Sequence, residues 1–256
     1  MSTIIEKNNA TSLSHLSEGS SNELKVLWSN SCITKTEWIG VIVSTTNQTD
    51  LSIIPLGQQS ESTVTTPAVD LYHRSQINRG SFDKKFVMEE IKIASQDLKQ
   101  TSDDSGFCYQ GKTLFLLPQK YMCDAISQVA TNEGDLLITE EEFLGFAHTH
   151  PYRNKINHLP SLADLRSFVF GQLNEVLGCI ISKNMVSVLA KPPESHYYFD
   201  RQKRHSYFQN QELLDAIKLE DQGYLSVLED NCHKFGLQLL HGNIQKNLQL
   251  YPFFKN

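Results

Sequence analysis

Residues 143–170 read FLGFAHTHPYRNKINHLPSLADLRSFVF, and this stretch predicts a strand, a loop and a helix in succession. The apolar run that starts at Phe143 and continues into the two histidines is typical of a strand that ends at His150. Ser161 and Asp164 have the spacing of a helix N-cap and its reciprocal capping residue, and an apolar run follows them. We therefore expect a helix that opens at Ser161.

Three side chains in this stretch have the chemistry of a metal site. A strand sends residues i and i+2 to one face, so His148 and His150 would present imidazoles roughly 7 Å apart at their backbones. Asp164 would add a carboxylate from the start of the helix. Two neutral imidazoles and one carboxylate suit zinc, and three protein ligands leave a fourth position for water. The stretch predicts a catalytic rather than a structural metal.

Other interpretations of these residues stay open. Two histidines one residue apart occur by chance on exposed strands, and Ser161 and Asp164 also fit a plain helix cap, a role compatible with metal binding. His158 is an alternative third ligand, which would give a three-histidine site. Asp164 is preferred because a helix holds it, whereas His158 lies within the loop between the two motifs.

A hydrolytic zinc also needs a general base, and Glu37 is the preferred candidate. Glu37 precedes WIGVIV, whose continuous apolar run predicts a buried central strand with the carboxylate at the mouth of a sheet. Glu142 would share a face with His148 but lie roughly 20 Å away along the strand. Glu89 and Glu90 belong to an amphipathic segment and are better explained as its solvated face.

Together these motifs resemble those of the JAMM metalloproteases, also called the MPN+ or JAB family. The family pattern is a glutamate, an H-x-H-P and an S-x-x-D, and here TEWIGVIV, HTHP and PSLAD carry it. The resemblance extends from about Glu23 to Lys191. Ten residues separate His150 from Ser161 where the family usually has seven, and a longer surface loop costs little free energy. The 110 residues between Glu37 and His148 also exceed the usual gap.

The resemblance implies a role for each site residue. His148, His150 and Asp164 would hold Zn²⁺, Glu37 would take a proton from the zinc-bound water, and Ser161 would hydrogen-bond the developing oxyanion. The implied activity is that of a zinc-dependent isopeptidase acting on ubiquitin or a ubiquitin-like modifier. Two other functions remain open, a noncatalytic MPN-type protein-binding scaffold and a zinc hydrolase acting on a small amide.

The chain divides into three predicted parts. Residues 1–22 are rich in Ser, Asn and Thr, which predicts a disordered tail. Residues 23–191 are expected to form an α/β catalytic domain, an MPN (JAB)-like mixed β-sheet flanked by helices, with an insertion at about 76–142. Residues 192–256 are expected to be a helical extension that packs on the core or docks a partner subunit.

Predicted strands and helices alternate along the catalytic domain. The strands cover residues 24–28, 38–44, 51–56, 64–72, 112–117 and 143–150, and a hairpin turning at Lys183 and Asn184 joins 176–182 to 185–191. Two further helices cover 84–98 and 118–130, the second with a proline near its first turn. In the extension, the helical spacing involves Leu213, Leu214, Ile217, Tyr224, Leu225 and Leu228.

Composition narrows the classes of function. The 256 residues are 39% hydrophobic and 20% charged, which is ordinary for a globular protein. A net charge of −6 offers no basic surface for nucleic acid. The sequence has neither the roughly 18-residue apolar stretch of a membrane span nor an apolar N-terminus, so a cytoplasmic protein is expected. Five cysteines without CxxC spacing predict reduced thiols and no thiolate zinc cluster.

Overall fold

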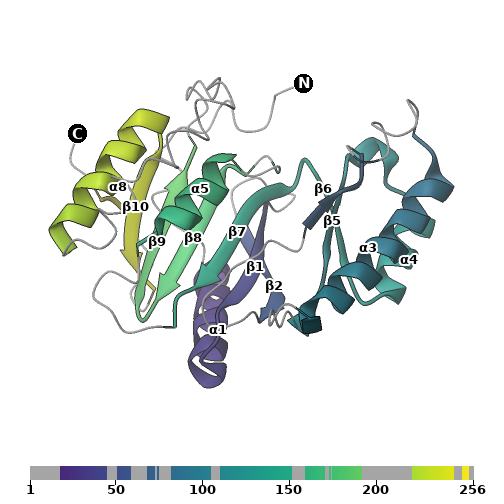
Figure 1. Ribbon diagram of the computed structural model, residues 1–256, viewed down its shortest axis with the longest axis horizontal. Coiled ribbons are helices and arrows are strands. Elements are labelled where there is room, and N and C mark those ends of the chain that lie inside the picture. Colours follow the sequence, from purple (N-terminus) through teal and green to yellow (C-terminus); the bar gives the residue numbers. More distant parts are fainter. Residues whose placement is uncertain are drawn as a thin grey trace.

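The computed structural model describes residues 18–44, 51–58, 68–72, 74, 82–104, 110–151, 159–170, 173, 175–191, 221–244 and 250–253. These residues form two β-sheets with helices packed on their faces (Figure 1). The helices are α1 (Glu18–Thr34), α3 (Lys84–Asp104), η2 (Gln119–Tyr121), α4 (Asp124–Asn132), α5 (Leu162–Phe170) and α8 (Asp221–Phe235). A mixed sheet flanked by helices agrees with the predicted α/β class. In the described part of the chain, no helix is both long and apolar enough to cross a membrane.

The larger sheet has eight strands in the order β11-β10-β9-β8-β7-β1-β2-β4. Their bounds are β1 (Trp38–Ser44), β2 (Leu51–Gln58), β4 (Gln110–Gly111), β7 (Phe143–Thr149), β8 (Leu177–Ser182), β9 (Met185–Ala190), β10 (Gln238–Asn243) and β11 (Tyr251–Pro252). All neighbouring pairs are antiparallel except β7 and β8, which are parallel. Every residue of β7 is buried, because strands flank it on both sides and helices cover the sheet.

Different helices pack on the two faces of the larger sheet. On one face, Leu24 and Leu27 of α1 share a buried cluster with Ile42 and Ala147. On the other face, residues of α5 and α8 form a second cluster with alternate residues of β8, β9 and β10: Leu165, Phe168, Leu228, Ile180, Leu189 and Leu239. Side chains alternate between faces along each strand, so neighbouring strand residues join different clusters.

The predicted insertion forms a layered unit of its own. Strands β3 (Ala68–Asp70), β5 (Leu114–Leu117) and β6 (Leu136–Thr139) make a parallel sheet in the order β3-β5-β6. Leu114 and Leu116 pack with residues of β1 and β7, whereas Phe115 and Leu117 pack with α3 and α4. Figure 1 shows this unit beside the larger sheet. It begins at β3, ahead of the predicted boundary near residue 76, because β3 pairs with β5 rather than with the larger sheet.

Several predicted elements are confirmed within two or three residues. They are β1, β2, β5, β7, the β8–β9 hairpin and the helix that opens after Ser161. Lys183 in the hairpin turn has a φ of 55°, as a tight turn between antiparallel strands requires. Helix α3 covers the predicted 84–98 and continues to Asp104. Of the predicted strand 64–72, residues 64–67 lie outside the described part, and β3 is limited to Ala68–Asp70.

The predicted strand at residues 24–28 is wrong, because these residues belong to helix α1. Leu24 and Leu27 are fully buried, and their spacing of three residues places both on one face of a helix. Glu23 on the same helix accepts a hydrogen bond from the backbone N–H of Ile53 in β2. Since α1 begins at Glu18, the predicted disordered tail is also wrong for residues 18–22, and residues 1–17 lie outside the described part.

The predicted helix 118–130 is split into η2 and α4. Cys123 lies between them with extended backbone angles, φ −156° and ψ 158°, so the helix cannot run through it. Strand β6 is absent from the sequence-based prediction, because its sequence LLIT is short and shows no hydrophobic period.

The C-terminal extension is helical only in part. The predicted helical extension 192–256 includes α8, but Leu239 and Leu240 lie in β10, which pairs with β9 and extends the larger sheet. Gly236 ends α8 with a φ of 60°, which turns the chain back toward the sheet. Tyr224 and Leu228 are buried against the core, as the packing interpretation predicts. Leu213, Leu214 and Ile217 lie outside the described part.

Free thiols occur at Cys123, Cys179 and Cys232. Burial raises the pKa of the Cys179 thiol to about 12, so this residue behaves as a small apolar side chain. The predicted reduced state agrees with these three residues, and Cys108 lies outside the described part.

Candidate metal centre

The sheet holds the two histidines of HTHP at the C-terminal end of β7. Within the β1–β7 pair His148 lies opposite Ile39, and within the β7–β8 pair it lies opposite Ile180. The backbone N–H of His150, just after the strand, donates to the carbonyl oxygen of Ile181 at 2.8 Å. Strands on both sides therefore fix the backbone of both histidines.

The start of helix α5 holds Asp164. The backbone N–H of Ser161 donates to Asp164 Oδ2 at 2.6 Å, and the backbone N–H of Asp164 donates to Ser161 Oγ at 3.1 Å. This reciprocal pair is the predicted capping arrangement. It gives hydrogen-bond acceptors to two backbone N–H groups at the helix start and fixes the orientation of the Asp164 carboxylate.

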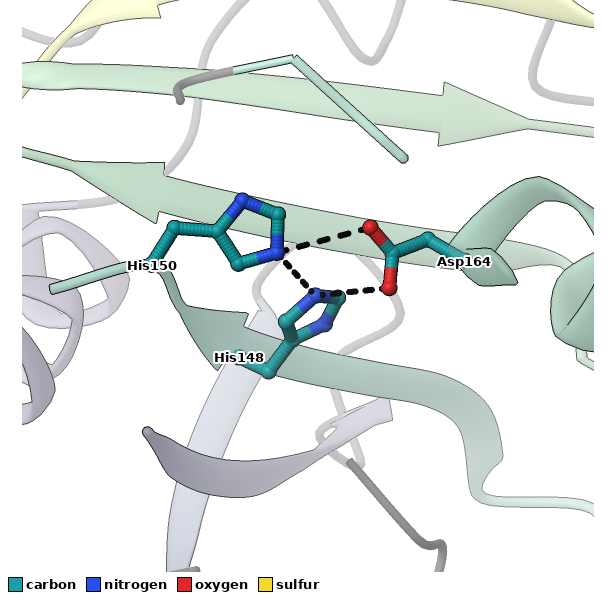
Figure 2. Close-up of side chains that lie close together, drawn as sticks. All are labelled: His148, His150 and Asp164. Atoms are coloured by element: carbon teal, nitrogen blue, oxygen red, sulfur yellow. Dashed lines mark hydrogen bonds and ion pairs between the residues drawn. The ribbon is translucent and has the colours of Figure 1, made fainter. Parts of the chain in front are cut away.

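His148, His150 and Asp164 converge on one point (Figure 2). The Nε2 atoms of the two imidazoles are 3.1 Å apart. His148 Nε2 lies 3.1 Å from Asp164 Oδ1, and His150 Nε2 lies 3.4 Å from Asp164 Oδ2. A tetrahedral zinc with bonds of about 2.0–2.1 Å separates its ligand atoms by about 3.3–3.4 Å. The donor set and its spacing fit a metal ion, so this group could hold one.

The electrostatics of Asp164 favour the charged form. Its burial acts to raise the carboxyl pKa, but the charges and hydrogen bonds of His148 and His150 outweigh burial and hold that pKa well below its usual range. Asp164 is therefore anionic at neutral pH, which is the form in which a carboxylate coordinates a metal.

Glu37 lies on the face of the sheet that carries the two histidines. The backbone N–H of Trp38 donates to Thr149 Oγ1 at 2.9 Å, one residue beyond the last backbone pair of β1 and β7. Continuing this antiparallel register sets Glu37 opposite His150, and alternation gives both side chains the same face. Glu37 is buried, with a relative exposure of only 7%.

Glu37 also interacts electrostatically with all three metal-ligand candidates. Burial raises the pKa of its carboxyl group, the charges of His148 and His150 lower that pKa, and the charge of Asp164 raises it. Burial has the largest effect, so the net pKa lies above the ordinary value. The structure thus brings Glu37, predicted from a separate strand, to the same locality as HTHP and PSLAD.

The other glutamates considered as general bases do not contact the three metal-ligand candidates in any interaction of the described residues; each has its own partner or is exposed. Glu142 Oε2 accepts a hydrogen bond from Thr139 Oγ1 at 2.7 Å, at the end of β7 away from the histidines. Glu90 forms an ion pair with Arg74 at 3.4 Å. Glu89 is exposed on α3, as predicted. His158, the alternative third ligand, lies outside the described residues.

Two residues that the sequence analysis did not assign to the site support it. Thr149, the middle residue of HTH, is fully buried and accepts the Trp38 N–H. Tyr224 of α8 donates its hydroxyl to the carbonyl oxygen of Pro160, directly before Ser161. Local pattern gives no signal for either contact, because each joins segments far apart in the chain.

Comparisons of this chain with protein-family models, with curated proteins and with solved structures found no match.

Proposed function

We propose that this protein is a JAMM-type, zinc-dependent isopeptidase that hydrolyses amide bonds of ubiquitin or a ubiquitin-like modifier. The observation that carries the proposal is the convergence of two imidazoles and one carboxylate, with a buried glutamate on the same face. The mixed sheet flanked by helices is compatible with an MPN-type fold. The choice of substrate rests on the resemblance of the three motifs.

The donor set supports zinc as the metal. Two imidazole nitrogens and one carboxylate oxygen suit zinc, and three protein ligands leave a coordination position open. When bound, zinc supplies Lewis acidity and lowers the pKa of a bound water to about 7. The residues that would hold it are His148, His150 and Asp164.

Glu37 is the proposed general base. Its carboxylate would accept a proton from the attacking water and deliver it to the nitrogen of the leaving amine. Its buried position raises the carboxyl pKa above the ordinary value, which brings the group closer to the range in which a base can also return the proton.

Ser161 is the proposed donor to the oxyanion. Its Oγ accepts the Asp164 N–H at 3.1 Å, and this bond does not use the hydroxyl proton. The hydroxyl can therefore donate to the oxygen of the scissile carbonyl as negative charge develops there. The capping bond also holds this oxygen in place before substrate binds.

The layered insertion is the proposed recognition element. It packs on the face of the sheet that carries the histidines, through a cluster that joins Leu114, Leu116 and Ile138 to Ile39 and Phe146. A unit carried beside a rigid active-site scaffold is well placed to select a protein substrate.

The experiment that tests the function begins with metal analysis of the purified protein, which should contain about one zinc per chain because the described residues hold one three-ligand group. Glu37→Gln should retain the metal and abolish cleavage of a panel of diubiquitins and ubiquitin-like fusions, since it removes only the proton relay. Glu89→Gln, an exposed glutamate on α3, is the matched control and should cleave normally.

Other results would replace the proposal. If the wild-type protein binds no zinc, the zinc-enzyme proposal is wrong and a noncatalytic protein-binding scaffold is favoured. Zinc-loaded protein that ignores every member of the panel but cleaves small amides would be a hydrolase of a different substrate class. Normal cleavage by Glu37→Gln would show that another group is the base.

A further inference from the structure

Helix α8 contributes a hydrogen bond to the segment that begins helix α5, beside the candidate metal centre. Tyr224 is 5% exposed and shares a buried cluster with Leu159 and Leu165, which lie on either side of the PSLAD turn. Its hydroxyl donates to the carbonyl oxygen of Pro160, a residue 64 positions earlier in the chain. The contact joins the C-terminal extension to the segment that carries the third metal ligand.

The acceptor of this bond belongs to a peptide group that has a second partner. The carbonyl of Pro160 and the N–H of Ser161 are the two ends of one planar amide. The N–H end donates to Asp164 Oδ2 at 2.6 Å. A continuous chain of hydrogen bonds therefore runs from the Tyr224 hydroxyl through this peptide to the Asp164 carboxylate.

The chain has two physical effects on the carboxylate. Because the amide is planar, holding its carbonyl end also fixes the direction of its N–H end. Hydrogen bonds in a series also polarise one another, so a donor to the carbonyl strengthens the N–H as a donor. Groups that hydrogen-bond a metal ligand directly typically change metal affinity by about 10–100-fold when removed, and Tyr224 acts one peptide further out, so its effect should lie at the lower end of that range.

We propose that Tyr224 is a positioning residue of the metal centre, whose hydroxyl orients the Asp164 carboxylate through the Pro160–Ser161 peptide. The inference rests on the proposed metal-dependent function. It assigns to the C-terminal extension a role in setting the metal site, beyond packing on the sheet.

The test uses the full chain and Co²⁺ alone as the probe, in place of zinc. Tyr224→Phe removes the hydroxyl and keeps the ring. We expect this variant to bind Co²⁺ about 10-fold more weakly than wild type and to show an altered visible absorption spectrum of the bound ion. Cys232→Ala is the matched control, because it removes a buried sulfur from the same cluster and leaves the hydroxyl in place. It should keep the wild-type affinity and spectrum.

The outcomes separate the inference from the proposed function. Tyr224→Phe with the affinity and spectrum of wild type would overturn the positioning role and leave the function intact. Equal losses of affinity in Tyr224→Phe and Cys232→Ala would also overturn it, because they would reflect general loosening of the cluster. Wild-type protein that binds no metal would overturn the function and the inference together. If Tyr224→Phe fails to fold, Tyr224→Met supplies the same test with a flexible apolar side chain.

Discussion

The backbone N–H of Ser161 lies 2.6 Å from Asp164 Oδ2, and Asp164 returns a hydrogen bond to Ser161 Oγ at 3.1 Å. One pair of residues thus begins helix α5 and orients the carboxylate that faces His148 and His150. Asp164 Oδ2 accepts the Ser161 N–H and also lies 3.4 Å from His150 Nε2, whereas Asp164 Oδ1 lies 3.1 Å from His148 Nε2. The same local folding signal is therefore part of the candidate metal centre.

Replacing His150 by alanine should remove the metal. The variant loses one of three ligands, so its zinc affinity should fall by more than the roughly 10–100-fold that follows loss of a supporting hydrogen bond. Metal analysis after dialysis measures the effect. His233→Ala is the control, because the His233 side chain is 65% exposed on α8. A His150→Ala protein with its full zinc content would contradict the proposed ligand set.

Replacing Ser161 by alanine should have two separable effects. Loss of the N-cap should lower the free energy of unfolding by about 1 kcal/mol. Loss of the oxyanion donor should lower kcat by about 10²–10³-fold. Denaturant unfolding and steady-state kinetics measure the two effects. Ser161→Thr keeps a hydroxyl and should recover most of the stability, whereas normal turnover by Ser161→Ala would refute the oxyanion role.

Replacing Gly145 by alanine should prevent β7 from pairing normally with β8. Gly145 has a φ of 146°, and a Cβ atom there would lie 1.8 Å from the carbonyl oxygen of Leu177. The clash is with backbone, so the destabilisation should exceed about 4 kcal/mol. Circular dichroism and thermal unfolding measure it.

Gly134→Ala is the matched control for that substitution. Gly134 also has a positive φ, 76°, but a Cβ there meets no heavy atom within 4 Å. The cost should be the backbone strain alone, about 1–2 kcal/mol. Equal effects of the two substitutions would contradict the close approach of β7 and β8.

Glu175 should make the protein less stable as pH rises. Burial raises the pKa of this 7%-exposed residue to about 8, and the charge of Lys191 opposes that rise. Its ordinary pKa is 4.5, so between about pH 4.5 and about pH 8 the folded protein holds a proton that the unfolded chain lacks. The stability contributed by the protonated group is complete below pH 4.5 and is lost as pH rises through 8.

Glu175→Gln should flatten this dependence, because glutamine is neutral at every pH. Urea unfolding at several pH values between 5 and 8 would show a smaller decline than in wild type. Glu89→Gln, on the exposed face of α3, should retain the wild-type decline. Parallel curves for wild type and Glu175→Gln would mean that Glu175 is ionised in the folded protein.

The parts of the site that could be predicted from the sequence are encoded within a few residues. His148 and His150 share a face because a strand repeats every two residues, and Ser161 and Asp164 pair because a helix start sets their spacing. By contrast, the apolar run at 24–28 is too short to distinguish a helix from a strand, and it was assigned wrongly. The buried contacts of Leu24 and Leu27 with the sheet favour the helix there.

Periodicity, capping and ligand chemistry, all local properties, were enough to identify the α/β class, most of the strands and the three metal-ligand candidates. Folding added the relationships between distant segments: the register that sets Glu37 beside His150, the separate parallel sheet of the insertion, and the hydroxyl of Tyr224 against Pro160. Such contacts depend on which surfaces of the whole chain are buried together, and no short window of sequence contains both partners.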